Sequence, residues 1–367
     1  MMKRFRDKLW LVPTALWSAL FLFSLVWLSF GQRKFHSVLR ALLQWDGQNY
    51  LSIARDGYQV YPCGFNPNWL CGNVGWFPFY PVVGKIFATV TFIEIPWAMA
   101  IVDWLAFLAA LILLARLVNR RLGANVSRGT ILALIVFPSS FYFFAGFPYA
   151  TYLLLAVIIF TLLESGRYWW TVLPAACLAL TYPSGLNIGL PLAWILMTKW
   201  KEITASKRLA LVSAIVAVGL SLFLYAGYYW WKFDDFFLFQ HFQSQSFYGH
   251  RITFPLLTFY RSLRALPPSS PEFIAIAFVV LTAILFYCRR IPAAWQLYAL
   301  GILLFTPTFG NTSSYYRRVI VAFPLFAMIA LSLESRWRRY LFGGYVVAAV
   351  VLMVTVFFAA FKHGTLM

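Results

Sequence analysis

The 367-residue chain is poor in charge, since only 11% of its residues are Asp, Glu, Lys or Arg and 62% are hydrophobic. A soluble globular domain carries about 25% charged residues, so this composition excludes an ordinary soluble domain. The apolar runs reach about 20 residues, the length that crosses a hydrocarbon core, and we interpret them as helices because backbone groups in lipid must be satisfied internally. The sequence therefore predicts an all-α polytopic membrane protein with a single integral-membrane domain over residues 1–367.

Acidic residues are especially scarce: 11 Asp and Glu stand against 30 Lys and Arg, which gives a formal net charge of +19. Such an excess suits a nucleic-acid partner, but the positions of the basic residues favour the positive-inside rule of membrane proteins. With the N-terminus in the cytoplasm, more than half of the basic residues fall in short cytoplasmic loops or tails, and most of the acids fall on or near the outer side. We therefore expect the lipid bilayer as a partner and no nucleic acid.

About eleven segments are predicted to span the membrane. The first is too long for the apolar region of a signal peptide and no small-residue cleavage site follows it, so we interpret it as a retained span. The remaining polar sequence forms three outer loops, residues 31–96, 232–272 and 308–318, and the first is expected to hold amphipathic helices over residues 35–54 and 79–95. The predicted spans are residues 9–30, 97–118, 129–146, 148–164, 169–183, 185–198, 209–231, 273–288, 292–307, 319–333 and 341–361.

Cysteine is also rare, with four residues in the chain. Two of them lie inside predicted spans and are interpreted as small apolar filler. Cys63 and Cys71 share the first outer loop, where they form either a disulfide, if that side is oxidising, or a pair of free thiols. No second ligand pair accompanies them and His241 and His250 have no compelling ligand spacing, so we expect neither a metal site nor a cofactor.

The first outer loop contains the most informative segment, WDGQNYLSIARDGY, at residues 45–58. It places the carboxylate of Asp46 beside Trp45 at the start of an amphipathic stretch. Asp56 precedes Gly57, a pair that is also typical of a turn. The run WFPFYP at residues 76–81 leads back toward the membrane, and later outer segments read FDDFFLFQHFQSQSFYGHR and NTSSYYRR.

These motifs, in this order, resemble the PIG-V-like mannosyltransferases of the GT-C glycosyltransferase superfamily. The resemblance covers most of the chain. The residues that carry it are Trp45, Asp46, Tyr50, Ile53, Ala54, Gly57 and Tyr58; Trp76, Phe77, Pro78, Phe79, Tyr80 and Pro81; Pro138, Ser139 and Tyr149; Asp235, Phe239 and Gln243; and Arg317 before Phe323 and Pro324.

The chain departs from the family pattern at three positions. Thr151 stands where the family usually has a Glu, Tyr182 stands where it has an Arg, and Arg318 stands where it has a Tyr. We therefore expect a donor or an acceptor that differs from the usual ones of the family.

The resemblance implies a GT-C-like bundle of about eleven transmembrane helices. It also implies inverting transfer of a hexose, mannose-like, from a polyprenyl-phosphate-sugar donor to a lipid-linked or glycan acceptor on the non-cytoplasmic face. The alternative from another class is a transporter or flippase for a polyprenyl-linked glycan, although the sequence lacks the paired, matching broken helices of many transporters. Short loops favour a bacterial plasma membrane, with the endoplasmic reticulum membrane as the alternative.

Transfer from a phosphate-linked sugar needs a base for the acceptor hydroxyl and cations for the departing phosphate. Asp46 is the predicted catalytic base, and Arg317, Arg318 and Arg251 are the predicted phosphate-binding residues. Asp103, near the outer end of a predicted span, is a second site acid, a partner for an arginine, or an interfacial acid that reaches water. The predicted supporting residues are Trp45, Asp56, Asp103, Asp235, His241, Gln243 and Tyr80.

Overall fold

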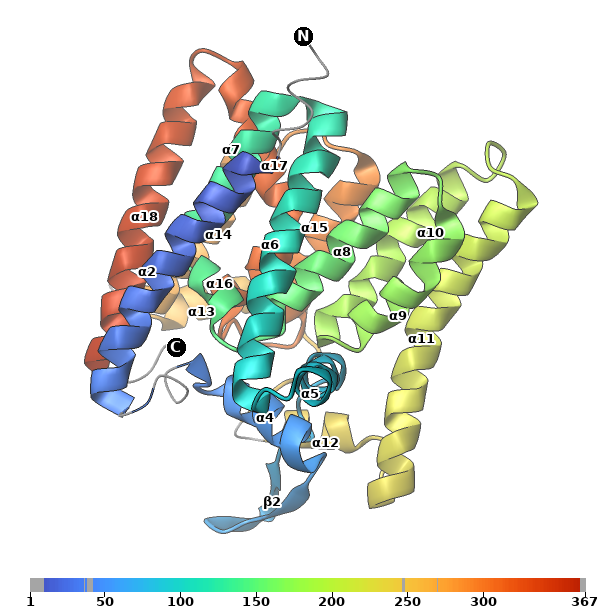
Figure 1. The fold of residues 1–367 in the computed structure, drawn as a ribbon, viewed down its shortest axis with the longest axis vertical. Helices are drawn as coiled ribbons and strands as arrows, with labels where there is room; N and C mark the ends of the chain where they lie inside the picture. Colours follow the sequence, from blue (N-terminus) through green and yellow to red (C-terminus); the bar gives the residue numbers. More distant parts are fainter. Residues whose placement is uncertain (1–9, 36, 38–41, 246–247, 269, 364–367) are drawn as a thin grey trace.

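A computed structural model describes residues 10–35, 37, 42–245, 248–268 and 270–363 of the chain (Figure 1). Helices make up most of these residues, and one antiparallel two-stranded hairpin is the β structure among them. The all-α expectation is confirmed for the described part of the chain. Residues 36 and 38–41 of the predicted amphipathic helix at 35–54 lie outside the described residues. Residues 43–45 are not helical, so this predicted helix is divided, and its last part begins at Asp46.

The longer helices are α2 (Leu11–Phe35), α6 (Ile95–Leu122), α8 (Tyr149–Glu164), α11 (Ala205–Phe233), α14 (Pro271–Phe286), α15 (Ala293–Thr308) and α18 (Arg338–His363). The shorter helices are α4 (Asp46–Asp56), α5 (Phe79–Thr91), α7 (Ala124–Ile135), α9 (Val172–Ala179), α10 (Gly189–Thr198), α12 (Leu238–Ser244), α13 (Pro255–Ala265), α16 (Tyr315–Arg318) and α17 (Phe323–Leu331). The 3₁₀ turns are η1 (Ser140–Phe144), η2 (Tyr168–Thr171), η3 (Pro183–Ile188), η4 (Val319–Val321) and η5 (Ser332–Glu334). Strand β1 (Val60–Cys63) pairs with β2 (Asn66–Gly72).

Three helices of the described chain are long and apolar enough to cross a bilayer: α6, α11 and the Arg338–Thr355 part of α18. A fourth candidate combines residues Tyr315–Val321 with Phe323–Glu334, but these two pieces meet at an angle of 78°. The other apolar helices, α8 among them, are shorter. The apolar helices thus indicate a membrane protein. The number of membrane crossings, about eleven, stays a prediction.

The predicted span 129–146 is divided in the structure. Helix α7 ends at Ile135 and the chain continues as the 3₁₀ turn η1. Pro138 lies at this break, and proline lacks the N–H group that would continue the helix. The next residue, Ser139, donates from its hydroxyl to the Tyr316 carbonyl at 2.9 Å. The break therefore ties the end of α7 to α16.

The predicted spans 169–183 and 185–198 are two short helices, α9 and α10, joined by η3. Tyr182 is extended (φ −161°, ψ 150°), because a residue before proline avoids the helical region. Gly185 allows η3 to fold back on α9, since a Cβ there would lie 2.1 Å from the Leu178 carbonyl oxygen. This tight return fixes the position of Tyr182.

Helix α17 lies inside the bundle, and all nine of its residues are buried (Figure 1). Pro324 stands in its first turn, where a missing N–H costs nothing. The backbone of Ala322 leaves the helical region (φ −77°, ψ 61°) and separates α17 from the preceding turn. The predicted span 319–333 is therefore bent, and Arg317 and Arg318 precede the bend.

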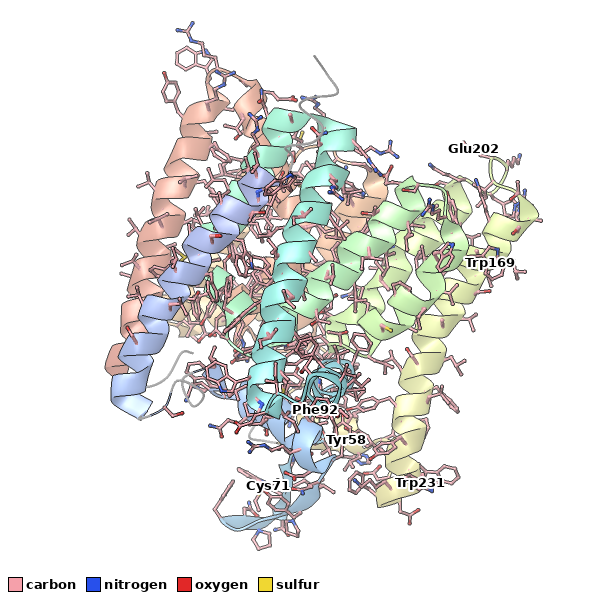
Figure 2. All side chains as sticks on the ribbon, viewed as in Figure 1. Tyr58, Cys71, Phe92, Trp169, Glu202 and Trp231 are labelled. Carbon is pink, nitrogen blue, oxygen red and sulfur yellow. A yellow bond between two sulfur atoms is a disulfide. The ribbon has the colours of Figure 1, made fainter. Side chains whose placement is uncertain are left out.

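Helices α4, α5 and α12 and the hairpin lie together at one end of the bundle, which we call the α4 end (Figure 1). Figure 2 shows Cys71 of the hairpin at this end and Glu202, in the loop before α11, at the opposite end. The Gln245 side chain holds the hairpin by donating to the Leu70 carbonyl and accepting from the Leu70 amide. The helices expected in the 31–96 loop, α4 and α5, thus lie beside the hairpin.

Candidate active site

Helix α4 begins with Asp46, and the residue before it, Trp45, has a positive φ (φ 50°, ψ −120°). This backbone region is costly for any residue except glycine. The next residue of α4 is Gly47, and a Cβ at this position would lie 3.3 Å from the Gly146 carbonyl oxygen. A small residue at 47 therefore lets the start of α4 lie against the turn that leads into α8.

Asp46 forms an ion pair with Arg317 of α16. The Arg317 Nη2 atom donates to Asp46 Oδ2 at 2.6 Å, across 271 positions of sequence. The Arg317 side chain is 10% exposed and that of Asp46 is 25% exposed. The structure thus brings together the predicted base and a predicted phosphate-binding residue, at the inner edge of the α4 end.

A row of side chains in contact connects Arg317 to Arg318. The Arg317 guanidinium carbon lies 5.1 Å from the centroid of the Phe147 ring, and that ring is stacked on Tyr149 with centroids 5.8 Å apart. The Tyr149 ring lies 5.7 Å from Tyr182, and the Arg318 guanidinium lies 5.9 Å from the Tyr182 centroid. We call these five residues the arginine–aromatic row. Cations over ring faces are stabilised by the ring quadrupole.

The row carries two cations, and Asp46 is the one carboxylate that pairs with either of them within the described part of the chain. The Nε atoms of Arg317 and Arg318 are both buried without a hydrogen-bond partner among the described residues. Guanidinium groups with unused donors bind carboxylate or phosphate well. The site is therefore suited to one further anion.

The His250 side chain adds no charge to this site. Burial, and after it the charge of Arg318, lowers the pKa of His250 to about 4, so this side chain is neutral near pH 7. Gln243 donates to the Gly75 carbonyl at 3.1 Å, which leaves its Oε1 atom to accept from His250 Nδ1 at 2.8 Å. Burial, and after it Asp46, raises the pKa of Tyr248 to about 12. Gln243, a predicted supporting residue, is thus connected to the site indirectly, by its hydrogen bond with His250.

Asp103 is fully buried on α6 and accepts a hydrogen bond from the Tyr80 hydroxyl at 2.6 Å. The expectations of an arginine partner and of an interfacial acid that reaches water are both wrong, because the aromatic ring of α5 covers this carboxylate. The Tyr80 ring meets Tyr50 edge-on, with centroids 5.6 Å apart. Tyr50 lies one turn after Asp46 on α4, so the Asp103–Tyr80 pair supports the helix that carries the predicted base.

The other predicted site residues lie further out. Asp235 pairs with the exposed His241 at 2.8 Å, and Asp56 and Arg251 are exposed. Asp235, Asp56 and Arg251 are therefore not part of the arginine–aromatic row. Cys63 and Cys71 are joined by a disulfide with Cα atoms 5.0 Å apart, which closes the hairpin. Among the described residues there is no group of three or more His, Cys, Asp or Glu side chains arranged to hold a metal ion.

Sequence reasoning missed Phe147, Tyr149 and Tyr182 as members of the site. The Trp76 ring of the WFPFYP run packs against Phe242. The available signal was positional: Phe147 and Tyr149 flank a proline at one helix break, and Tyr182 precedes a proline at another. Breaks that lie on the same side of a bundle bring such residues together.

Comparison with known proteins gives little further information. No family model matches the sequence, and no curated protein matches it. A solved structure of the Archaeoglobus fulgidus oligosaccharyltransferase, in complex with Zn and sulfate, is similar over 90% of this chain with 10% sequence identity and a TM-score of 0.45. The chain spans about half the length of that protein, since 52% of it is covered. A score of this size does not establish a common fold.

Proposed function

We propose that the protein is an integral-membrane inverting glycosyltransferase of the GT-C type. It transfers a hexose, mannose-like, from a polyprenyl-phosphate-sugar donor to a lipid-linked or glycan acceptor. The observation that carries this proposal is the Asp46–Arg317 ion pair, because it places the predicted base against one predicted phosphate-binding arginine, with a second, Arg318, next in the chain. The ordered motifs that resemble the PIG-V-like family point to the same reaction.

The proposed step is a displacement at the anomeric carbon of the donor sugar. The acceptor hydroxyl attacks this carbon, its proton passes to an Asp46 carboxylate oxygen, and the bond from the carbon to the phosphate oxygen breaks. The electron pair leaves with polyprenyl phosphate, whose negative charge Arg317 and Arg318 stabilise. Inversion follows because the hydroxyl and the phosphate lie on opposite faces of the sugar carbon.

The ion pair gives this site a way to couple donor binding to catalysis. In the empty site the Asp46 Oδ2 atom accepts from Arg317 Nη2 at 2.6 Å, so this oxygen is occupied. A donor phosphate offers Arg317 a second anion, and sharing Arg317 with that phosphate releases Asp46 for the acceptor hydroxyl. Asp46 therefore becomes an effective base when the donor is bound, which limits unproductive chemistry in the empty site.

The proposed orientation places the α4 end on the non-cytoplasmic side, with about eleven crossings and a bacterial plasma membrane as the location. The basic loops at residues 199–208 and 120–128 support this orientation through the positive-inside rule. A disulfide between Cys63 and Cys71 suits an oxidising compartment on the side of the hairpin.

The test is turnover of a labelled polyprenyl-phosphate hexose by the purified protein in proteoliposomes. Asp46→Asn keeps the side-chain shape but cannot take the proton, and loss of a general base costs about 10²–10⁴-fold in rate. The matched control is Asp56→Asn, which changes an exposed acid at the other end of the same helix. Near-normal turnover by Asp46→Asn would refute the mechanism. Movement of intact labelled donor across the bilayer, with no polyprenyl phosphate released, would identify a flippase.

A further inference from the structure

Helix α8 begins inside the candidate active site with an uncapped N-terminus. Its 16 residues start at Tyr149 after Pro148, no side chain caps the first turn, and no acidic residue lies in that turn. The first amide groups of a helix have no partner within it, and the helix dipole makes this end positive. This arrangement is common and does not by itself define a binding site.

The first residue of α8 adds an independent observation. Tyr149 is 1% exposed, and its hydroxyl is buried without a hydrogen-bond partner among the described residues. A buried hydroxyl that stays unpaired is costly, so such a group indicates a partner that is supplied from outside the protein. The Tyr149 phenol interacts electrostatically with Arg317, Arg318 and Asp46, which places it among the charged groups of the site.

The balance of charge at this point favours an anion. The positive end of α8 and the guanidinium groups of Arg317 and Arg318 converge near Tyr149, and Asp46 is the carboxylate that faces them. Gly47 brings the start of α4 against the turn before α8, so Asp46 approaches the same helix end. The negative charge of Asp46 offsets one of these positive groups. An anion bound at the start of α8 would offset the positive charge that is left.

We propose that the N-terminus of α8 is a subsite that binds the phosphate group of a prenyl-phosphate lipid. The first-turn amides and the Tyr149 hydroxyl donate to the phosphate oxygens, and Arg317 and Arg318 neutralise their charge. The proposal deepens the function proposed above and rests on it for the identity of the lipid donor. Tyr149 acts here as a donor-binding residue and takes no part in the proton transfer of Asp46.

The experiment measures ligand-dependent thermal stability of the full-length protein in detergent. The probes are inorganic phosphate and a short-chain prenyl phosphate, each compared with chloride at equal ionic strength. A ligand that binds the folded state alone raises the unfolding temperature in a saturable way. We expect Tyr149→Phe, which removes one oxygen and keeps the ring, to weaken prenyl-phosphate affinity about 10-fold, the effect of one charge-assisted hydrogen bond.

The matched control is Tyr152→Phe. Tyr152 is fully buried on the same helix, but its hydroxyl pairs with Ser184 at 3.4 Å instead of facing the arginines. We expect this variant to keep the affinity of the parent for prenyl phosphate. Equal affinities in the parent, Tyr149→Phe and Tyr152→Phe would overturn the subsite. Inorganic phosphate that stabilises as strongly as prenyl phosphate at equal concentration would overturn the assignment to a lipid.

Donor kinetics separate this inference from the proposed function. Tyr149→Phe should raise the donor KM about 10-fold and change kcat much less, because the lost contact binds the donor before the reaction. If the protein transfers no sugar but Tyr149→Phe still loses prenyl-phosphate stabilisation, the subsite stands and the proposed function fails. If transfer occurs and the donor KM of Tyr149→Phe equals that of the parent, the subsite fails and the proposed function stands.

Discussion

Arg317 donates to Asp46 at 2.6 Å and at the same time lies against the rings of Phe147 and Tyr142, at 5.1 and 5.8 Å. The carboxylate therefore uses one edge of a guanidinium group whose face is fixed by aromatic side chains. The Nε donor of Arg317 is buried without a partner among the described residues. Arg317 thus has donors for a second anion while it still contacts Asp46.

The first prediction concerns Arg317. We expect Arg317→Ala to raise the donor KM roughly 10- to 100-fold, because a hydrogen bond from a charged group contributes about 1.5–3 kcal/mol. Arg317→Lys should fall between the parent and Arg317→Ala, since lysine keeps the charge but loses the planar fork. The control is Arg55→Ala, at an exposed arginine of α4. Unchanged donor kinetics in Arg317→Ala would contradict a role of this arginine in donor binding.

The second prediction concerns Tyr182 and Arg318, two positions at which the chain departs from the family pattern and which contact each other at 5.9 Å. Tyr182→Arg places two cations together, and Arg318→Tyr removes the cation. The double variant again has one arginine against one tyrosine, with the arginine at position 182 and the tyrosine at position 318. We expect it to be more stable and more active than either single variant, with a coupling free energy of about 0.5–2 kcal/mol from a double-mutant cycle. Additive effects would contradict this pairing.

The third prediction concerns pH. The pKa of His250 is about 4 in the folded protein, below the ordinary value near 6.5, so the unfolded state binds more protons between these values. The stability contributed by neutral His250 is complete above about pH 6.5 and falls as the pH drops toward 4. His250→Gln should reduce this loss in thermal unfolding measured from pH 7.5 to 4.5. The exposed His241, changed to Gln, is the control. Parallel curves for His250→Gln and the parent would exclude this role.

The fourth prediction concerns the buried pair of Tyr80 and Asp103. Asp103→Asn keeps an oxygen that accepts from the Tyr80 hydroxyl, whereas Asp103→Leu leaves that hydroxyl only the long contact of 3.4 Å to the Met99 carbonyl. We expect Asp103→Leu to lower the free energy of unfolding by about 1–3 kcal/mol and Asp103→Asn to change it less. Because Tyr80 supports Tyr50 and α4, Asp103→Leu should also reduce kcat. Chemical unfolding with both variants checks the order, and equal loss of stability would contradict it.

The fifth prediction concerns orientation. Thr204 is exposed at the start of α11, and Asn68 is exposed on the hairpin. The start of α11 and the hairpin lie at opposite ends of the bundle, so a cysteine is introduced at each position in turn (Figure 1). We expect a membrane-impermeant maleimide to label Asn68→Cys on intact cells and to label Thr204→Cys only after permeabilisation. Labelling of Thr204→Cys from outside would reverse the proposed orientation.

Much of the helical content was predictable from the sequence, because hydropathy marks apolar segments. The long helices α6 and α11 cover the predicted spans 97–118 and 209–231 with a few residues added at each end. Hydropathy does not show where an apolar segment is broken. The breaks depend on Pro138 and on the Tyr182–Pro183 pair. The sequence therefore predicted the class, the helical segments and the boundary between α9 and α10, but not the break that divides the predicted span 129–146.

The candidate site shows the same limit. Asp46 and Arg317 were each predicted as site residues from their chemistry, but their direct contact depends on two short helices whose packing no local pattern encodes. Asp103 and Tyr80 were both predicted as supporting residues, but nothing in the sequence paired them with each other. Local patterns therefore identified individual residues, whereas the contacts between them required the tertiary arrangement.

The distance in sequence between Asp46 and Arg317 also has a consequence for biosynthesis. Ribosomes add about 5–20 residues per second, so the 271 positions between these residues take on the order of 15–50 s to synthesise. Throughout this interval the nascent chain holds the acid without its arginine. A chain that stops before α16 lacks both guanidinium groups and leaves α4 without its partner. The ion pair thus makes the assembly of the site one of the last events in the maturation of the chain.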